Sequence, residues 1–305
     1  MKDTIRSPFF YVGDKYKLMK QLNQLFPKDI DRYIEPFVGG GSSFLNSKGN
    51  QYILNDVDKN VIQLHEELGK YADKPEELLN KLYEKIDYYS LSCSYRNINV
   101  PTELKKQYVK TYYSVYNKNA YSKMRKDYNN NPTDKLLLYL LLIYGFNHMI
   151  RFNSKGEFNL PVGNVDFNKN VYNALVSYLD FRKNNKIEFK NADYKEFLND
   201  ISITTNDYVF LDPPYLISMS EYNKLWNPEK EKELCNFLDM LDEKGIKFGI
   251  TNLINHKGKE NTIFNEWSKK YKVFNIESNY ISFNDNTIKK DSKEVFVTNY
   301  AKNKE

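Results

Sequence analysis

The chain has 305 residues, of which 41% are hydrophobic and 28% are charged, and its formal net charge is +5. This length has room for a catalytic domain of ordinary size and a smaller second domain. The mean hydropathy is −0.71, and the longest apolar run, residues 136–144, is far shorter than the about 20 residues of a membrane span. Residues 1–6 are polar and the two cysteines have no metal-site spacing, so we expect a cytoplasmic protein without signal peptide, membrane segment or metal.

The positive charge is concentrated in one part of the sequence. Residues 81–155 contain thirteen Lys or Arg and five Asp or Glu, so the remainder of the chain is net acidic. A local excess of this kind is typical of a surface that faces a polyanion. Lys, Asn, Ile and Tyr are frequent throughout the chain, however, so part of this pattern reflects composition alone.

The first predicted elements are a helix over residues 14–26 and a strand over 33–35, followed by a glycine turn and a helix from near Ser42. Strand, glycine turn and helix form the layout of a nucleotide-type cofactor loop. The glycines lack dinucleotide spacing, and Glu35 at the strand end would repel a pyrophosphate. This favours a cationic cofactor without phosphate.

A second strand, residues 52–56, also ends in an acid. Asp56 is placed to accept hydrogen bonds from ribose hydroxyls. Much later, the apolar residues 209–211 predict a buried strand that must stop at Asp212, because Pro213 and Pro214 cannot continue a ladder of hydrogen bonds. Carboxylates at three strand ends fit the sulfonium and ammonium groups of S-adenosylmethionine.

Helical spacing dominates the middle of the chain, with helices predicted over 58–71, 75–89, 102–117 and 134–144. Residues 136–142 are apolar on all sides and predict a central buried helix. The turn-forming residues within 151–163 then predict a hairpin. In it, Arg151 and Lys155 are suited to guanine edges or phosphates and Asn153 to adenine, although the residues alone fit an ordinary surface hairpin equally well.

Alternation of helix and strand resumes afterwards, with a helix over 171–182 and a strand over 187–189. Asp193 and Tyr194 follow that strand and are suited to an adenine amine and ring face. The polar residues 218–227 are expected to fold over a bound base. A helix over 229–244 and strands over 247–252, 271–277 and 294–300 complete an α/β sheet.

The chain resembles the Dam-type DNA adenine-N6 methyltransferases, the D12 class of the alpha group. The resemblance rests on residues 10–15, 35–41, 56, 146–163, 191–194, 212–215 and 247–252. It implies a Rossmann-like, S-adenosylmethionine-dependent methyltransferase sheet with an inserted helical DNA-recognition domain. The catalytic domain would comprise residues 1–58 and 170–305, and the insertion residues 59–169 with the DNA-contacting hairpin 151–163.

The resemblance also implies roles for individual residues. The cofactor contacts would be Tyr11, Lys15, Glu35, Phe37, Gly39, Asp56, Asp193, Tyr194 and Asp212, and the catalytic residues Asp212, Pro213, Pro214 and Tyr215. The family usually has Trp and Gly where this chain has Tyr11 and Asp14, and basic residues in place of Phe10 and Asn164. These departures leave the recognition sequence open; GATC, the commonest in the family, is our expectation.

The expected reaction is methyl transfer to N6 of an adenine flipped out of duplex DNA. Asp212 and the Pro213 carbonyl would each accept one N6 hydrogen, and Tyr215 would stack on the base. The residues leave three other functions open: cytosine-N4 transfer, an RNA or protein amine methyltransferase, and a catalytically silent DNA-binding regulator. A restriction endonuclease acting on the same site is the expected functional partner.

Overall fold

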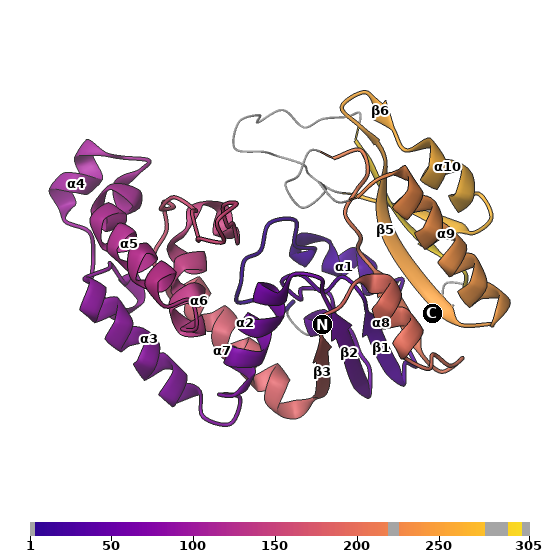
Figure 1. The fold of residues 1–305 in the computed structure, drawn as a ribbon, viewed down its shortest axis with the longest axis horizontal. Coiled ribbons are helices and arrows are strands. Elements are labelled where there is room, and N and C mark those ends of the chain that lie inside the picture. The colour runs from indigo at the N-terminus through magenta and orange to yellow at the C-terminus, as the bar shows by residue number, and fades with distance from the viewer. Residues whose placement is uncertain (1–3, 219–225, 278–291, 301–305) are drawn as a thin grey trace. The chain divides into compact units, whose positions relative to one another are not determined.

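The computed structural model describes residues 4–218, 226–277 and 292–300, and it contains two compact units (Figure 1). The sheet unit comprises residues 17–38, 46–57 and 186–305, and the helical unit comprises residues 1–16, 39–45 and 58–185. The predicted Rossmann-like α/β fold is confirmed. The predicted division into domains is a different partition, because it places residues 1–16, 39–45, 58 and 170–185 with the sheet, and it stays a prediction.

In the part of the chain that the structure describes, the sheet unit has eight strands. They are β1 Arg32–Glu35, β2 Gln51–Asn55, β3 Lys186–Lys190, β4 Tyr208–Leu211, β5 Lys247–His256, β6 Lys259–Glu260, β7 Lys272–Ile276 and β8 Lys293–Thr298. Their order is β3-β2-β1-β4-β5-β8-β7, and β6 pairs with β5. The first five strands of this order are parallel, whereas β8 is antiparallel to both of its neighbours. The direction of progression through the sheet reverses between β1 and β4.

Both faces of the central strands are covered, which explains the continuous apolar run of β4. The register pairs Tyr33 with Tyr208 and Ile34 with Val209. Ile34 and Val209 contribute to a core with the helices on one face. On the other face Tyr33 and Tyr208 lie 5.9 Å apart between ring centroids and both contact Phe26. Side chains that alternate along a strand thus enter two separate apolar layers.

The helices of the sheet unit are short except for one. They are α1 Met19–Leu22, α8 Tyr194–Asp200, α9 Pro228–Glu243 and α10 Thr262–Ser268. Helices α9 and α10 lie side by side and pack on β5 (Figure 1). As predicted, Pro228 occupies the first turn of α9, and the Asn227 side chain caps it by accepting a hydrogen bond from Lys230 N at 2.9 Å.

Two helices predicted near the amino terminus are wrong in extent. In place of a helix over 14–26, a 3-10 turn at Tyr16–Leu18 leads into α1, and the chain then continues in turns. The Asp14 side chain accepts from Tyr16 N at 3.3 Å, and Leu25 N donates to Leu22 O at 2.8 Å, so local turn bonds replace helical ones. The helix expected from Ser42 is reduced to a 3-10 turn, Phe44–Asn46.

The helical unit is organised around one fully buried helix. Its helices are α2 Lys59–Gly69, α3 Pro75–Tyr89, α4 Thr102–Gln107, α5 Tyr112–Asn130, α6 Lys135–Tyr144 and α7 Lys169–Asn184. Residues 136–144 of α6 are all buried, and α6 packs on α2, α3 and α5, as the sequence predicts for a central helix. Asp134 caps it by accepting from Leu137 N at 2.9 Å.

The single helix predicted over residues 102–117 is wrong. The structure has α4 and α5 instead, separated by a turn in which Thr111 N donates to Tyr108 O at 2.8 Å. Asn164, distant in sequence, fixes this break: its side chain accepts from Tyr113 N at 3.0 Å and donates to Lys110 O at 2.7 Å. A tertiary contact therefore determines where α5 begins.

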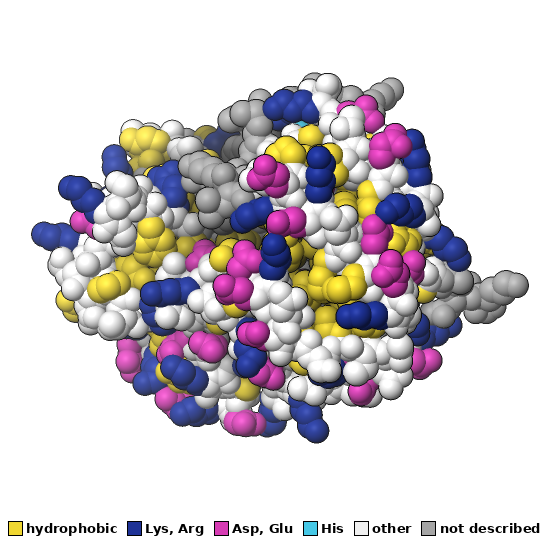
Figure 2. All heavy atoms as spheres, turned by 45° about the vertical axis from the view of Figure 1, so that its right-hand side comes forward, with side chains coloured by type: hydrophobic (Ala, Val, Ile, Leu, Met, Phe, Trp, Pro, Cys, Tyr) yellow, Lys and Arg dark blue, Asp and Glu magenta, His cyan; other side chains and the backbone are white. Residues whose placement is uncertain are grey.

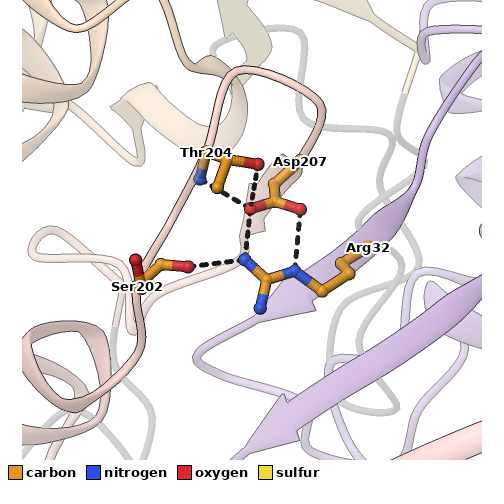
Figure 3. A network of polar contacts seen from close by, with 4 residues as sticks. All are labelled: Arg32, Ser202, Thr204 and Asp207. Carbon is orange, nitrogen blue, oxygen red and sulfur yellow. Dashed lines mark hydrogen bonds and ion pairs between the residues drawn. The ribbon is translucent and has the colours of Figure 1, made fainter.

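An ion pair joins β1 and β4 at the edge of the sheet where both strands begin (Figure 3). Arg32 donates through Nε and Nη2 to the two carboxylate oxygens of Asp207, at 2.9 and 2.5 Å. Thr204 donates to the same carboxylate through its amide at 2.7 Å and its hydroxyl at 3.0 Å. Burial opposes ionisation of Asp207, but these hydrogen bonds outweigh it and lower its pKa below the ordinary value.

The surface carries charges of both signs. On the face shown in Figure 2, Lys and Arg side chains are intermingled with Asp and Glu. Among the described residues, no helix has both the length and the apolar character needed to cross a membrane.

Candidate functional site

The carboxyl ends of β1 and β4 bring together two of the predicted acids. Glu35 is the last residue of β1, and Asp212 directly follows β4, the neighbouring strand. The strand order reverses between these two strands, and open α/β sheets bind ligands outside the carboxyl ends at such a point. Residues 177 positions apart in the sequence, 35 and 212, thus lie at the same edge of the sheet.

The carboxylate of Asp212 is held by two hydroxyl groups. Its Oδ1 atom accepts from Thr251 Oγ1 at 2.7 Å and from the Tyr215 hydroxyl at 3.1 Å. The Tyr215 hydroxyl also lies 2.7 Å from Oε1 of Glu294, so two carboxylates compete for its single proton. These contacts restrict rotation of the Asp212 side chain and keep its orientation relative to β4 and β5.

Sequence reasoning missed Thr251 and Glu294. Thr251 was part of a matching segment, but only the register, which pairs Leu211 with Ile250, places it beside Asp212. Glu294 is 2% exposed on β8, the antiparallel strand next to β5. In the sequence, the available signal was an acidic residue directly before the apolar residues 295–297.

Pro213, Pro214 and Tyr215 leave the sheet after β4, as prolines require. Tyr215 is 8% exposed and clusters with Ile217 and Leu253. Ser218 N donates to Tyr215 O at 3.1 Å, which closes a turn. Most of the segment 218–227, expected to fold over a base, lies outside the described residues.

The end of β2 is tied to both of its neighbouring strands. Asn55, which is fully buried, donates to Pro36 O at 3.1 Å and to Ala192 O at 3.0 Å, and accepts from Ala192 N at 3.0 Å. Asn191 donates to Asp56 O at 2.8 Å. Asn55, another residue missed in the sequence, therefore positions the segments that carry Glu35, Asp56 and Asp193.

Aromatic rings accompany these acids. Phe37 and Tyr194 lie 5.2 Å apart between ring centroids, at an interplanar angle of 34°. Asp193 caps α8 by accepting from Lys195 N at 2.9 Å, and Tyr194 is the first residue of that helix. Six of the predicted cofactor residues thus belong to the sheet unit and lie at, or shortly after, the ends of β1 to β4. They are Glu35, Phe37, Asp56, Asp193, Tyr194 and Asp212.

The other three predicted cofactor residues, Tyr11, Lys15 and Gly39, belong to the helical unit. A Cβ atom on Gly40 would lie 2.7 Å from Cβ of Tyr11, so only glycine fits there. Ser7 donates to Gly40 O, which fixes the same loop. Lys15 is 9% exposed, and its Nζ lies 3.4 Å from Gly13 O.

The carbonyl of Gly39 accepts a hydrogen bond from a buried histidine. His65 Nε2 is 2.9 Å from Gly39 O, and its Nδ1 is 2.9 Å from the Tyr178 hydroxyl. Because a carbonyl only accepts, Nε2 carries the proton and Nδ1 accepts from Tyr178. Arg182 in turn donates to the Tyr178 hydroxyl at 3.2 Å. Burial lowers the pKa of His65 to about 3, so the ring is neutral at physiological pH.

The predicted hairpin is present as a short, irregular loop. Phe152 and Phe158 form an antiparallel bridge. Asn153 accepts through its side chain from the amides of Lys155 and Glu157, at 2.9 and 3.0 Å, and donates to the Glu157 carboxylate at 2.9 Å. Asn153 therefore shapes the turn, and Lys155 at the tip is exposed.

The base of the hairpin is fixed by further hydrogen bonds. Arg151 donates twice to Asn159, to the side chain and to the backbone carbonyl, both at 2.9 Å. Asn129 of α5 exchanges two bonds with Phe158, accepting from its amide at 2.8 Å and donating to its carbonyl at 3.0 Å. Of the three predicted DNA contacts, Arg151 and Asn153 use their side chains for hydrogen bonds within the hairpin. Lys155 takes part there through its backbone amide only. In the described residues, no group of three or more His, Cys, Asp and Glu is arranged to hold a metal ion.

The sequence profile of the D12 class N6 adenine-specific DNA methyltransferases matches residues 11–281. The chain belongs to this family. The resemblance to Dam-type enzymes inferred from the sequence is thereby confirmed.

Individual relatives of this D12-class chain are named as methylases or methyltransferases. It is 35% identical to the modification methylase StsI of Streptococcus sanguinis and 33% identical to the type II methyltransferase M.FokI of Planomicrobium okeanokoites, over 98% and 97% of its length. It spans only 43% of each of these relatives. It is 25% identical to the DNA adenine methylase of Escherichia coli, over 92% of this chain and 90% of that protein.

Proposed function

We propose that this chain transfers a methyl group from S-adenosylmethionine to N6 of an adenine flipped out of duplex DNA. One observation carries the proposal above all others: Asp212 follows β4 at the reversal of strand order, and Thr251 and Tyr215 hold its carboxylate in place. Membership of the D12 class supports the same reaction.

The residues of the sheet unit fit a cationic adenosyl donor. Bound S-adenosylmethionine supplies an electrophilic methyl group on a sulfonium. Glu35, Asp56 and Asp193 provide anionic acceptors for its ammonium, ribose and adenine amine, and Phe37 and Tyr194 provide ring contacts. Tyr11, Lys15 and Gly39 stay predicted contacts of the same cofactor.

The target amine is a weak nucleophile because its lone pair is delocalised into the adenine ring. The Asp212 carboxylate and the Pro213 carbonyl each accept one N6 hydrogen, which directs the nitrogen lone pair away from the ring plane. Thr251 and Tyr215 hold the Asp212 carboxylate before the substrate arrives, and this preorganisation and the alignment of the two substrates lower the barrier. Tyr215 contributes its ring to the base and its hydroxyl to Asp212.

We propose that the helical unit binds the duplex DNA substrate. Lys155 is exposed on the hairpin, and the basic excess of residues 81–155 lies in the same unit. The names of the relatives support a role in a restriction-modification system beside an endonuclease that recognises the same site. The enzyme then acts in the cytoplasm, and GATC is the first sequence to test.

The deciding experiment is expression of the chain in a bacterial host without adenine methylation, followed by direct sequencing of host DNA for N6-methyladenine. We expect one methylated motif in wild-type cells and none with Asp212→Ala. Asp239→Ala, which removes another hydrogen-bonded acid of the sheet unit, tests whether loss of a carboxylate as such abolishes methylation. Methylation by Asp212→Ala at the wild-type level would rule out the proposed acceptor.

Cytosine-N4 transfer is the second candidate, because the same pair of acceptors suits either exocyclic amine. Mass analysis of nucleosides from the same DNA separates the two products. N4-methylcytosine without N6-methyladenine would reassign the target base while leaving the proposed geometry in place.

A further inference from the structure

A buried carboxylate on α9, with no part in the proposed methyl transfer, is the centre of a hydrogen-bond network. Glu231 is 1% exposed. It accepts from the indole Nε1 of Trp226 at 2.5 Å and from the side-chain amides of Asn252 and Asn261 at 2.8 and 2.7 Å. Three donors on one side chain fit the ionised form, which only accepts. The network thus fixes the indole relative to β5 and to the start of α10.

The indole completes an aromatic cluster at the carboxyl edge of the sheet. The ring of Trp226 lies 5.8 Å from that of Phe37 at 81°, and 5.7 Å from that of Tyr194 at 49°, between centroids. Phe37 follows the end of β1 by two residues, and Tyr194 begins α8 shortly after β3. The cluster is therefore on the side of the sheet where the cofactor acids lie.

A buried hydroxyl in this cluster points to a ligand. The hydroxyl oxygen of Tyr194 is buried and has no hydrogen-bond partner among the described residues. Burial raises the pKa of Tyr194, so the hydroxyl keeps its proton at neutral pH and is a donor. A desolvated donor without an acceptor is unfavourable. A heterocycle with acceptor nitrogens, such as a purine, would satisfy the donor while contacting the three rings.

We propose that Trp226 forms a wall of the adenine subsite and that Glu231 is the positioning residue that holds its indole there. The inference rests on the proposed function, since it takes the methyl donor to be an adenosyl compound. Glu231 acts through Trp226 and does not itself touch the ligand. Burial raises the pKa of the Glu231 carboxyl, and its three donors oppose that shift. Replacing the carboxylate would release the indole without removing a ring from the cluster.

The first test uses tryptophan fluorescence, because the chain has only two tryptophans. Wild type and Trp226→Phe, which keeps Trp267, are titrated with S-adenosylhomocysteine, adenosine and methionine, with calorimetry in parallel. We expect a saturable fluorescence change with the first two ligands in wild type only. Calorimetric binding without that change would overturn the subsite and leave the cofactor proposal intact. No binding of any adenosyl compound would instead refute the proposed function.

The second test separates positioning from simple stability. Glu231→Gln leaves one acceptor oxygen where two carboxylate oxygens serve three donors, so the indole and the asparagine amides can no longer all be satisfied. We expect roughly tenfold weaker binding of S-adenosylhomocysteine, with kcat at saturating S-adenosylmethionine within about twofold of wild type. Glu233→Gln, on the same helix but exposed and paired with Lys195 at 3.1 Å, is the matched control and should leave binding unchanged. Thermal unfolding is measured for both. A destabilised Glu231→Gln protein with wild-type affinity would show that Glu231 is only structural.

Discussion

The hydroxyl of Thr251 donates a 2.7 Å hydrogen bond to Oδ1 of Asp212, and this bond links β5 to the residue that follows β4. Thr251→Val keeps the shape of the side chain and removes the donor. A hydrogen bond to a charged group contributes about 1.5–3 kcal/mol, so we expect kcat for methyl transfer to fall about 10- to 100-fold.

The control for this variant is Thr298→Val on β8, which removes a buried hydroxyl that donates to Phe248 O at 2.6 Å, far in register from Asp212. Steady-state turnover on duplex DNA at saturating cofactor is the measurement. Equal turnover for wild type and Thr251→Val would show that the orientation of Asp212 does not depend on this bond.

The hairpin offers a test that separates charge from shape. Lys155→Ala removes an exposed charge and should weaken DNA binding at low salt, with the slope of log affinity against log salt reduced by about 1. Asn153→Ala opens the turn that its side chain holds, and should weaken binding to all sequences without changing that slope. Lys190→Ala, in the sheet unit, is the control. If Asn153→Ala instead relaxes discrimination at a single base, Asn153 reads that base directly.

The ion pair between partly exposed Arg32 and buried Asp207 predicts a large effect on stability, because loss of Arg32 leaves the buried carboxylate without its charged partner. Removing one partner of such a pair costs about 3–5 kcal/mol, so Arg32→Met should lower the free energy of unfolding by about that amount. Because the pKa of Asp207 is lowered in the folded chain, the pair stabilises above the unfolded pKa, and its contribution is lost as pH falls through the folded value.

Urea unfolding at pH 7 measures the effect, with Lys269→Met as the control, since Lys269 forms an exposed pair with Glu266 at 2.6 Å. This control should change the free energy of unfolding by less than about 1 kcal/mol. A change as small for Arg32→Met would contradict the importance assigned to the pair.

Protonation of His65 predicts a loss of stability in acid. The unfolded chain binds a proton at this residue below about pH 6.5, whereas the folded chain does so only near pH 3, so stability falls as pH drops between these values. Compared with His65→Gln, wild type should lose about 2 kcal/mol more of its unfolding free energy between pH 6.5 and 5. Parallel curves for the two proteins would mean that the imidazole is accessible to protons in the folded state.

The sequence predicted those parts of the fold in which local pattern and burial agree. β4 has a continuous apolar run, α3 begins at a proline and matches its predicted bounds 75–89, and α6 is apolar on all sides. In each case the spacing of apolar residues is enough to predict the element, because no distant residue determines where it ends. The acids that follow β1, β2 and β4 were identified for the same reason.

The partners of those acids were not predictable, because strand order and register are not local properties. Thr251 and Glu294 reach Asp212 and Tyr215 only through the pairing of β4, β5 and β8. Similarly, Asn164 breaks a helical pattern more than forty residues before it, and Glu231 gathers three donors from separate segments. A polar residue outside an amphipathic pattern does not indicate its role in the sequence alone, because that role depends on which residues the fold places beside it.

The pairing of β1 with β4 has a consequence for the length of the segment between them. Arg32 and Asp207 are 175 residues apart in sequence yet adjacent in the sheet, and the helices α2 to α7 lie between β2 and β3 within that interval. The entropy of closing a flexible loop grows only logarithmically, about 0.6 kcal/mol for each doubling of its length. The helical segment can therefore lengthen or shorten at small entropic cost while the register of β1 with β4, Tyr33 with Tyr208 and Ile34 with Val209, is kept.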